Sequence, residues 1–238
     1  MLYWGQGSFS LEGTGTVKSS ETPESDLRIR AAVVILRAGG VIAFPTDTLY
    51  GLGADAFNVE AIERVFTAKG RDREHGLPVL IADATQIRQV AVNVSKAADH
   101  LATKFWPGAL TLVLKRSPDL PAIVSGGVPT VAVRVPNHPI PVRIIRTLGN
   151  PIVGTSANRA GSEDSTTIAE VEDRIGPWLD YVFEDDSFEP QGEPSTIVDM
   201  TTRRPRVLRE GAVTSEEIFQ ALEELKTEDP RDEPERVR

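Results

Sequence analysis

The sequence of 238 residues contains no cysteine and only three histidines, His75, His100 and His138. Without cysteine the protein can form neither disulfides nor thiolate zinc sites, and nothing indicates an oxidising compartment. The histidines lie too far apart in the sequence to suggest a zinc site. A metal ion used by this protein should therefore be a hard cation, bound by oxygen atoms and by substrate phosphates.

Long hydrophobic runs are also absent. No apolar stretch approaches the ~20 residues that cross a bilayer. The first 27 residues lack the features of a secretory signal, because no basic residue precedes Lys18 and no long apolar run follows it. These absences predict a cytoplasmic protein without a membrane partner.

Positive charge is in deficit, with 26 lysines and arginines against 35 acidic residues and a formal net charge of -9. This balance argues against a large nonspecific nucleic-acid surface, which needs an excess of cations, but it leaves room for a local basic cleft. With 40% hydrophobic and 26% charged residues the composition is that of a globular protein. The length fits one generous domain or two small ones, with enough chain for a sizeable core.

Several common enzyme motifs are missing too. The sequence has no G-x-x-x-x-G-K-[ST] loop, no G-x-G-x-x-G after a strand, no H-E-x-x-H and no G-x-S-x-G. Any phosphate chemistry must therefore use a different arrangement of cations and backbone amides.

Between two polar ends, helical and strand patterns alternate. Residues 1–25 are rich in Gly, Ser and Thr and are predicted to be a flexible arm, and residues 226–238 a flexible tail. Residues 26–225 are predicted to form one domain. Its first helix carries Leu27, Ala31 and Val34 at helical spacing and ends at Gly39. Several strands are joined by loops too short for a helix, which favours an α/β domain with a mixed sheet.

Two short segments carry groups suited to phosphate or substrate binding. Residues 44–53 run from a strand into Thr46, Asp47 and Thr48 and two glycines, which predicts either a ligand-binding loop or a turn held by its own side chains. Lys69 and Arg71 follow a predicted helix. They are either ordinary cations at a helix end or a clamp for a triphosphate, with Arg71 as a bidentate fork.

Two further segments place polar groups at strands. Residues 151–158 form an apolar strand that ends in short polar residues, which favours a ligand site and a helix cap or Asx-turn about equally. Arg134 lies inside an apolar strand, so it should face a carboxylate or a ligand, because an unpaired buried charge is costly. Ser195 and Arg209, near two later strands, are weak signals by themselves.

Read together, these segments resemble one family. Seven short motifs follow one another across residues 26–225: P-T-D-T-L-Y-G-L-G, K-G-R, W-P-G-A-L-T, V-A-V-R-V-P-N-H-P, S-A-N, S-T-I-V-D and R-E-G. In this order they resemble the YrdC/TsaC-like threonylcarbamoyl-adenylate synthases, in the short form with a single YrdC-like domain. The resemblance implies an open, twisted mixed β-sheet with flanking helices and a concave cleft.

The resemblance also implies a reaction. L-Threonine, bicarbonate and ATP would give threonylcarbamoyl-AMP and pyrophosphate, with Mg²⁺ held mainly through the phosphates. A separate tRNA threonylcarbamoyl transferase would use the product to modify the adenosine next to the anticodon; direct tRNA binding by this chain stays open. The central hypothesis is that the cations at 69, 71, 134 and 209 meet in one pocket.

Site residues carry over position by position. Lys69 and Arg71 match the catalytic pair. The ATP-binding set implied is Lys69, Arg71, His75, Thr111, Ser156, Asn158, Ser165 and Arg209, and the threonine-binding set is Thr48, Arg134, Gly154 and Ser195. No residue is expected to bind a metal directly. The sequence departs from its relatives around His75, Leu80, Asp164 and Ser165.

Three other functions compete with this one. An RNA-binding module for tRNA or double-stranded RNA would need a basic cleft, against which the acidic balance weighs. A carbamoyl-adenylate enzyme of hydrogenase maturation would have acylphosphatase and zinc-finger parts that are absent here. A noncatalytic adenylate-binding protein would not need the cations at K-G-R.

Overall fold

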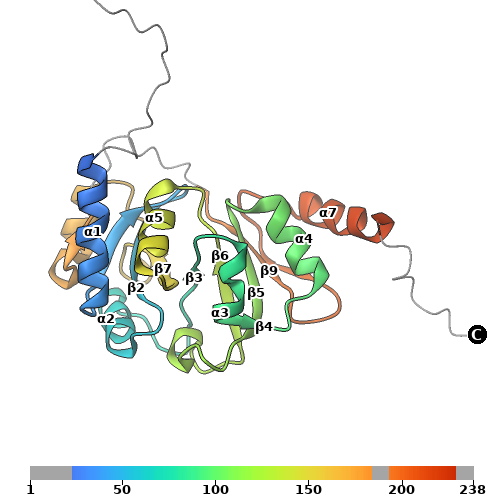
Figure 1. Cartoon of the computed structure of the whole chain (residues 1–238), viewed down its shortest axis with the longest axis horizontal. Helices are drawn as coiled ribbons and strands as arrows, with labels where there is room; N and C mark the ends of the chain where they lie inside the picture. Colours follow the sequence, from blue (N-terminus) through green and yellow to red (C-terminus); the bar gives the residue numbers. More distant parts are fainter. Residues whose placement is uncertain (1–22, 184–192, 229–238) are drawn as a thin grey trace, which may run out of the picture.

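A mixed β-sheet runs through the whole computed structural model, which describes residues 23–183 and 193–228 (Figure 1). Ten strands of the described residues form it, in the order β10-β9-β5-β6-β3-β7-β2-β1-β8, with β4 paired to β5. Their bounds are β1 Ile42–Pro45, β2 Tyr50–Asp55, β3 Val79–Leu80, β4 Ala91–Val92, β5 Leu110–Arg116, β6 Thr130–Arg134, β7 Ile152–Ser156, β8 Tyr181–Val182, β9 Thr196–Asp199 and β10 Arg206–Arg209.

The predicted mixed sheet is confirmed. Three strand pairs are parallel, namely β1 with β8, β3 with β6 and β5 with β9. The remaining pairs, such as β1 with β2 and β2 with β7, are antiparallel. The sheet is open, because β10 and β8 end the strand order without pairing with each other.

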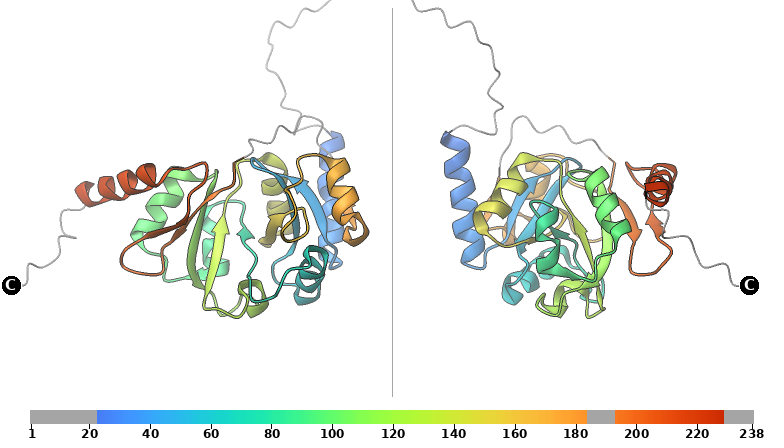
Figure 2. Two further views of the ribbon diagram at one scale, coloured as in Figure 1. Left: turned by 180° about the vertical axis from the view of Figure 1, so that it is seen from behind. Right: turned by 45° about the vertical axis from the view of Figure 1, so that its right-hand side comes forward.

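Seven α-helices of the described residues flank the sheet. They are α1 Pro23–Arg37, α2 Val59–Lys69, α3 Ile87–Val90, α4 Lys96–Phe105, α5 Pro139–Leu148, α6 Ile168–Ile175 and α7 Ser215–Glu228. The helices α1 and α7 lie at opposite ends of the sheet in both views of Figure 2. They extend three residues beyond each predicted edge of the domain, while the rest of the predicted arm and tail lies outside the described residues.

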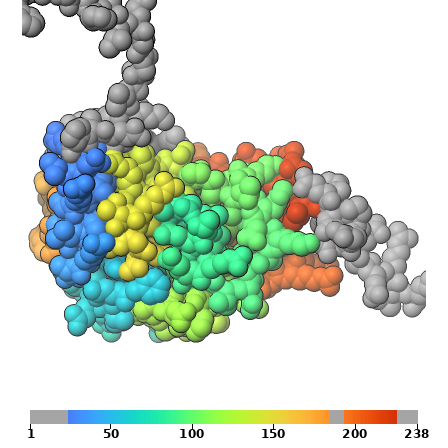
Figure 3. All heavy atoms as spheres, in the orientation of Figure 1, coloured from blue at the N-terminus to red at the C-terminus, as the bar shows by residue number. Residues whose placement is uncertain are grey.

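Alternate residues along the strands enter two different hydrophobic clusters. Val41 and Ala43, before and within β1, belong to the larger cluster, together with residues of α2, α4, α6 and α7. Ile42 and Phe44 belong to the smaller one, with α1 and α5. Side chains of α1, α5 and α3 lie side by side on the face seen in Figure 3. This period-2 division is what a strand buried on both faces requires.

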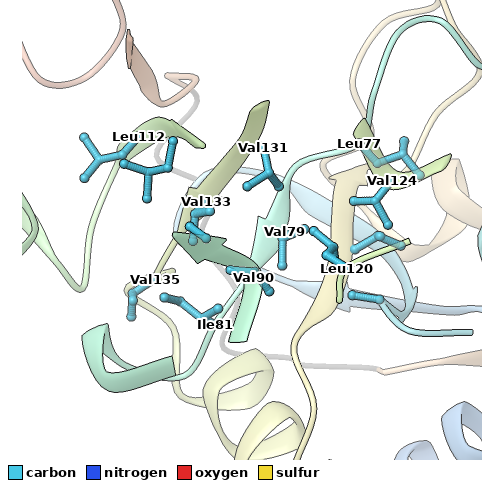
Figure 4. Packing of buried hydrophobic residues seen from close by; sticks show 14 of the residues in the cluster. Leu77, Val79, Ile81, Val90, Leu112, Leu120, Val124, Val131, Val133 and Val135 are labelled. Carbon is cyan, nitrogen blue, oxygen red and sulfur yellow. The ribbon is translucent and has the colours of Figure 1, made fainter. Parts of the chain in front are cut away.

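The larger cluster contains aliphatic side chains from neighbouring strands, drawn in Figure 4. Val79 and Ile81 come from β3 and the residue after it, and Val131 and Val133 from β6. Branched side chains pack well on a pleated surface, so the packing of these side chains holds the strands against the helices that cover them.

One predicted loop is a strand. Residues 50–55 form β2, buried along its whole length, although their two glycines predict a turn. Close neighbours explain the glycines. A Cβ at Gly51 would lie 2.9 Å from Cε2 of Phe44, and one at Gly53 would lie 2.6 Å from the carbonyl oxygen of Val153 and 2.7 Å from Cε1 of Phe44. The glycines therefore make room for an aromatic ring inside the sheet.

Candidate active site

A cavity of about 540 Å³ lies against the face of β5, β6 and β9 that does not meet α4. Alternation along β5 explains its lining: Leu110, Leu112 and Leu114 enter the core, while Thr111 and Val113 line the cavity. The predicted site residues that line it are Thr48, Arg71, Thr111, Arg134, Gly154, Ser156, Ser195 and Arg209.

A second cavity of about 400 Å³ lies at the end of α2. The predicted residues that line it are Lys69, Arg71, His75, Ser156 and Asn158. Arg71 and Ser156 line both cavities, so the two are neighbours with a shared wall. The cations at 71, 134 and 209 thus meet in the first cavity, and Lys69 lies in the second.

Arg134 is nearly buried and meets a protein carboxylate. Its Nη2 donates to both oxygens of Asp47 at 2.7 Å, and its Nε donates to the carbonyl oxygen of Gly108 at 2.9 Å. Burial lowers the pKa of Arg134, the Asp47 carboxylate opposes that shift, and the nearby Arg209 adds to it. The prediction that Arg134 faces an anion is confirmed, with Asp47 as that anion.

The loop that carries Asp47 is held by Thr46. The Thr46 hydroxyl accepts from the backbone N–H groups of Thr48 and Leu49, both at 3.2 Å, and donates to the carbonyl oxygen of Leu49 at 2.7 Å. The predicted side-chain turn is therefore confirmed for Thr46. Thr48 Oγ1 lies 3.4 Å from Nη1 of Arg134, so the turn presents both Asp47 and Thr48 to the same guanidinium.

Arg209 reaches across from β10 to Ser195. Its Nη2 donates to the carbonyl oxygen of Ser195 at 2.7 Å, and the Ser195 and Thr111 hydroxyls are 2.9 Å apart. These contacts bring together three predicted site residues from three strand regions of the sequence.

Lys69 directs its hydrogen bonds to the protein. Its Nζ lies 2.6 Å from the carbonyl oxygen of Ser156, 2.9 Å from that of Asn158 and 3.1 Å from Asn158 Oδ1. An ammonium has three protons, so these acceptors use all of them. Burial lowers the pKa of Lys69 to about 8, helped by the nearby Arg71 and opposed by Asp164.

Arg71 follows the turn that ends α2, and only its backbone takes part in that turn. Gly70 has a left-handed backbone with φ of 56°, and its N–H and that of Arg71 cap the last carbonyls of α2. Among residues 23–183 and 193–228, the guanidinium of Arg71 has no hydrogen bond or ion pair. Burial lowers its pKa. The turn thus aims an unpaired arginine at the wall shared by the two cavities.

Asn158 organises the segment after β7. Its Oδ1 accepts from the Ser156 hydroxyl at 2.6 Å, and its Nδ2 donates to the carbonyl oxygen of Ser162 at 2.7 Å. The structure shows the local turn in residues 151–158, and the same side chains line the cavities, so the ligand site stays a prediction.

Ser165 is the one predicted residue that lines neither cavity. It is fully buried, and its hydroxyl donates to the carbonyl oxygen of Ala157 at 2.8 Å. Its neighbour Asp164 lines the first cavity instead. A buried serine whose proton closes a turn has none left to donate to a ligand, so the structure does not bring Ser165 into the site.

Sequence reasoning missed two side chains of the site, one bonded to the lining residue Arg134 and one in the wall of the second cavity. Asp47 was one of several polar residues in its loop, and nothing local marked it as the partner of an arginine 87 residues away. Arg159, which lines the second cavity, follows the S-A-N segment as an ordinary exposed arginine. Leu80, whose role the sequence left open, lines the first cavity over Gly154.

Metal clusters and membrane spans are both missing from the described part of the chain. Within residues 23–183 and 193–228, no cluster of three or more His, Cys, Asp or Glu side chains could hold a metal ion. In the same ranges, no helix has both the length and the apolar character of a membrane span.

Comparisons with known proteins agree on one family. A model named for Sua5, YciO and YrdC, described as "Telomere recombination", matches residues 34–211. A threonylcarbamoyl-AMP synthase of Pyrococcus abyssi is 38% identical over 200 residues, which are 84% of this chain and 58% of that protein. A putative threonylcarbamoyl-AMP synthase of Mycobacterium tuberculosis is 34% identical over 209 residues, 88% of this chain and 95% of that protein.

A solved structure agrees with these sequence matches. The crystal structure of P. abyssi Sua5 complexed with L-threonine superposes with a TM-score of 0.79 at 37% identity. The match covers 83% of this chain and 58% of that one. This chain therefore spans little more than half the length of the Pyrococcus protein.

Proposed function

This chain belongs to the Sua5/YciO/YrdC family, and on that premise we propose that it is an enzyme that makes L-threonylcarbamoyl-AMP from L-threonine, bicarbonate and ATP. The names of the related proteins support this reaction. The observation that carries it is the pair of adjoining cavities, one lined by Arg134 and Arg209 and the other by Lys69, with Arg71 common to both. Two neighbouring anion sites suit an amino acid and a nucleotide.

The amino acid occupies the first cavity in this proposal. Thr48, Arg134, Gly154 and Ser195 line it together and include a guanidinium, two hydroxyls and a glycine backbone. Arg134 already has Asp47 as a partner through Nη2, so its Nη1 beside Thr48 is the donor that meets a substrate carboxylate. The cavity wall is thereby fixed before the substrate arrives.

The nucleotide lies across the wall shared by the cavities. Arg71 donates to its phosphates, Ser156 and Asn158 shape the loop beside them, and Lys69 contributes positive charge. Thr111 and Arg209 in the first cavity and His75 in the second complete the proposed set; Ser165 is not retained. The phosphates of ATP would be the main ligands of Mg²⁺, which would neutralise part of their charge, and the Asp164 carboxylate in the cavity wall is an oxygen ligand of the kind that Mg²⁺ prefers.

The reaction needs positioning and charge neutralisation more than a covalent nucleophile. The threonine amine adds to carbon dioxide supplied by bicarbonate, which releases water and gives a carbamate. A carbamate oxygen attacks the α-phosphorus, a P–O bond forms, and pyrophosphate leaves with the electron pair of the broken bond. Arg71 at the shared wall and Lys69 in the second cavity stabilise the charge that moves onto pyrophosphate.

The cellular setting follows from the same proposal. The protein acts in the cytoplasm and passes its reactive product to a separate tRNA threonylcarbamoyl transferase, because a mixed carbamic–phosphoric anhydride hydrolyses in water.

A pyrophosphate-release assay tests the function. Release should require ATP, threonine and bicarbonate together, and omission of either threonine or bicarbonate should abolish it. Mass spectrometry should detect the adenylate. Pyrophosphate release without threonine would contradict the proposal, and a salt-dependent shift of tRNA without any adenylate would support the RNA-binding alternative instead.

A further inference from the structure

Arg159 extends over the K-G-R segment, although the family resemblance gives it no role. A Cβ at Gly70 would lie 2.8 Å from its Nη2, so its guanidinium occupies the space that a side chain at position 70 would fill. That space lies between Lys69 and Arg71 in the chain. Because position 70 is a glycine, the guanidinium of Arg159 can lie against the backbone there, beside Lys69 and Arg71 in the chain.

Two contacts hold Arg159 there. Its Cζ lies 5.2 Å from the centroid of the Trp178 ring, within the range of a cation–π interaction. The N–H of the next residue, Ala160, donates to the carbonyl oxygen of Lys69 at 2.8 Å. The first contact uses the face of the guanidinium and the second uses only backbone, so neither consumes the side-chain N–H donors of Arg159.

The second cavity therefore has two arginines with spare donors. Neither Arg71 nor Arg159 has a side-chain hydrogen bond or ion pair within the described ranges 23–183 and 193–228. A guanidinium presents its N–H groups as a planar fork that matches phosphate oxygens. Lys69, by contrast, has all three protons on protein oxygens. A phosphate in this cavity would find its hydrogen-bond donors on the arginines.

The charge of the cavity wall agrees with an anion. Its lining contains three cations, Lys69, Arg71 and Arg159, against one acid, Asp72. Cations gathered without matching acids repel one another, and an anion relieves that repulsion. Because the chain as a whole has a net charge of -9, this local excess of cations is not a general property of its surface.

We propose that Arg159 is a phosphate-binding residue of the second cavity, where it acts with Arg71 on the β- and γ-phosphates of ATP and on pyrophosphate as it leaves. This inference rests on the proposed function for the identity of the phosphate compound. Trp178 is then a positioning residue that holds the guanidinium over Gly70. Lys69 acts through the loop that it bonds and through its charge.

The test measures binding without turnover. Pyrophosphate, ATP and AMP are each titrated into the full chain and into Arg159→Ala and Arg159→Lys. The Ala variant should bind pyrophosphate and ATP about tenfold more weakly, the loss expected for a charged hydrogen bond. AMP lacks the β- and γ-phosphates, so its affinity should stay within about twofold of wild type. The Lys variant keeps the charge without the fork and should be intermediate.

Arg88→Ala is the matched control. Arg88 is an exposed arginine of α3 that lines neither cavity, and its loss changes the net charge equally. This variant should bind all three ligands like wild type. Unchanged pyrophosphate affinity in Arg159→Ala would overturn the inference, and so would an equal loss of AMP affinity, because that would mean a disturbed loop.

These binding data separate the two proposals. If wild type makes no adenylate but its pyrophosphate affinity depends on Arg159, the proposed reaction fails and the phosphate site stands. If wild type makes the adenylate and Arg159→Ala binds pyrophosphate normally, the reaction stands and the role of Arg159 is lost.

Discussion

Both carboxylate oxygens of Asp47 lie 2.7 Å from Nη2 of Arg134, and each side chain is at most one-tenth exposed. The pair joins the turn after β1 to the end of β6, two walls of the same cavity. Because the pair is almost completely shielded from water, it fixes the direction of the guanidinium, and the Asp47 carboxylate neutralises part of the positive charge of Arg134. The first cavity thus contains an arginine that is oriented before any substrate binds.

Asp47→Asn should destabilise the protein, because it leaves the buried Arg134 charge without its counter-ion. Loss of one partner of a buried pair costs about 3–5 kcal/mol. Urea unfolding measures the change in the free energy of unfolding. Glu24→Gln is the control, since it breaks an exposed pair with Arg28 at 2.9 Å and should cost less than about 1 kcal/mol. Equal effects of the two substitutions would contradict the structural role of Asp47.

Arg71→Ala should lower turnover at least tenfold. Its guanidinium is the unpaired cation on the shared wall, and a charged hydrogen bond to a phosphate contributes about 1.5–3 kcal/mol. Pyrophosphate release at saturating threonine measures the effect, with Arg88→Ala expected to match wild type. Near-normal turnover in the Arg71 variant would remove this residue from the mechanism.

ATP affinity should fall as the pH rises through about 8. Burial and the nearby Arg71 lower the pKa of Lys69 to about 8, and the phosphates of bound ATP would raise it again. Binding near pH 8 should therefore take up protons, which calorimetry in two buffers of different ionisation enthalpy detects. Lys69→Met should bind ATP without this uptake. The same uptake in that variant would assign the proton to another group.

Without ATP the same pKa acts on stability in the opposite direction. The pKa of Lys69 is about 8 in the folded protein, whereas its ordinary value is 10.5, so the unfolded chain binds more protons between these two values. The free energy of unfolding should therefore rise with pH across this window, relative to Lys69→Met. Unfolding curves at about pH 7.5 and about pH 10 test the sign, and parallel behaviour of the two proteins would contradict it.

Gly154→Ala should be destabilising although the backbone tolerates it. Its Cβ would lie 2.4 Å from Cδ1 and 2.5 Å from Cγ of Leu80, and such overpacking costs about 1–3 kcal/mol. Adding Leu80→Ala should recover part of the loss, which thermal unfolding measures. Gly176→Ala is the control, because its Cβ would have its closest contact at 3.8 Å. Additive losses in the double variant would mean that Leu80 is not the obstacle.

The local features of the fold could be predicted from the sequence. Asn58 caps α2 through the N–H of Ala61, and Gly70 ends it in a left-handed turn. Thr214 and Glu217, three residues apart, form a capping box at the start of α7. Such features depend on hydrogen bonds between residues a few positions apart, so the nearby sequence contains all the information that they need.

Prediction from the sequence failed where tertiary packing determined the structure of a segment. Residues 50–55 have the glycines of a loop, but they pair with β1 and β7 as a buried strand, and the ring of Phe44 occupies the space that the glycines leave. Leu27 and Val34 fit an apolar helix stripe, yet both are two-thirds exposed, because Ile29, Val33 and Leu36 face α5 and the sheet. A helix with apolar residues on two sides is oriented by packing, which its own sequence does not specify.

By itself, the sequence determined the alternation of helices and strands, the mixed sheet, and the short polar segments that line the cavities. Only the tertiary structure decided which groups meet: Asp47 with Arg134, Lys69 with the loop after β7, and Arg159 with Gly70. The physical reason is how far apart the interacting residues are in the sequence. Caps and turns form between neighbours in the chain, whereas ion pairs and cavity walls depend on the strand register that brings residues dozens of positions apart within a few ångströms.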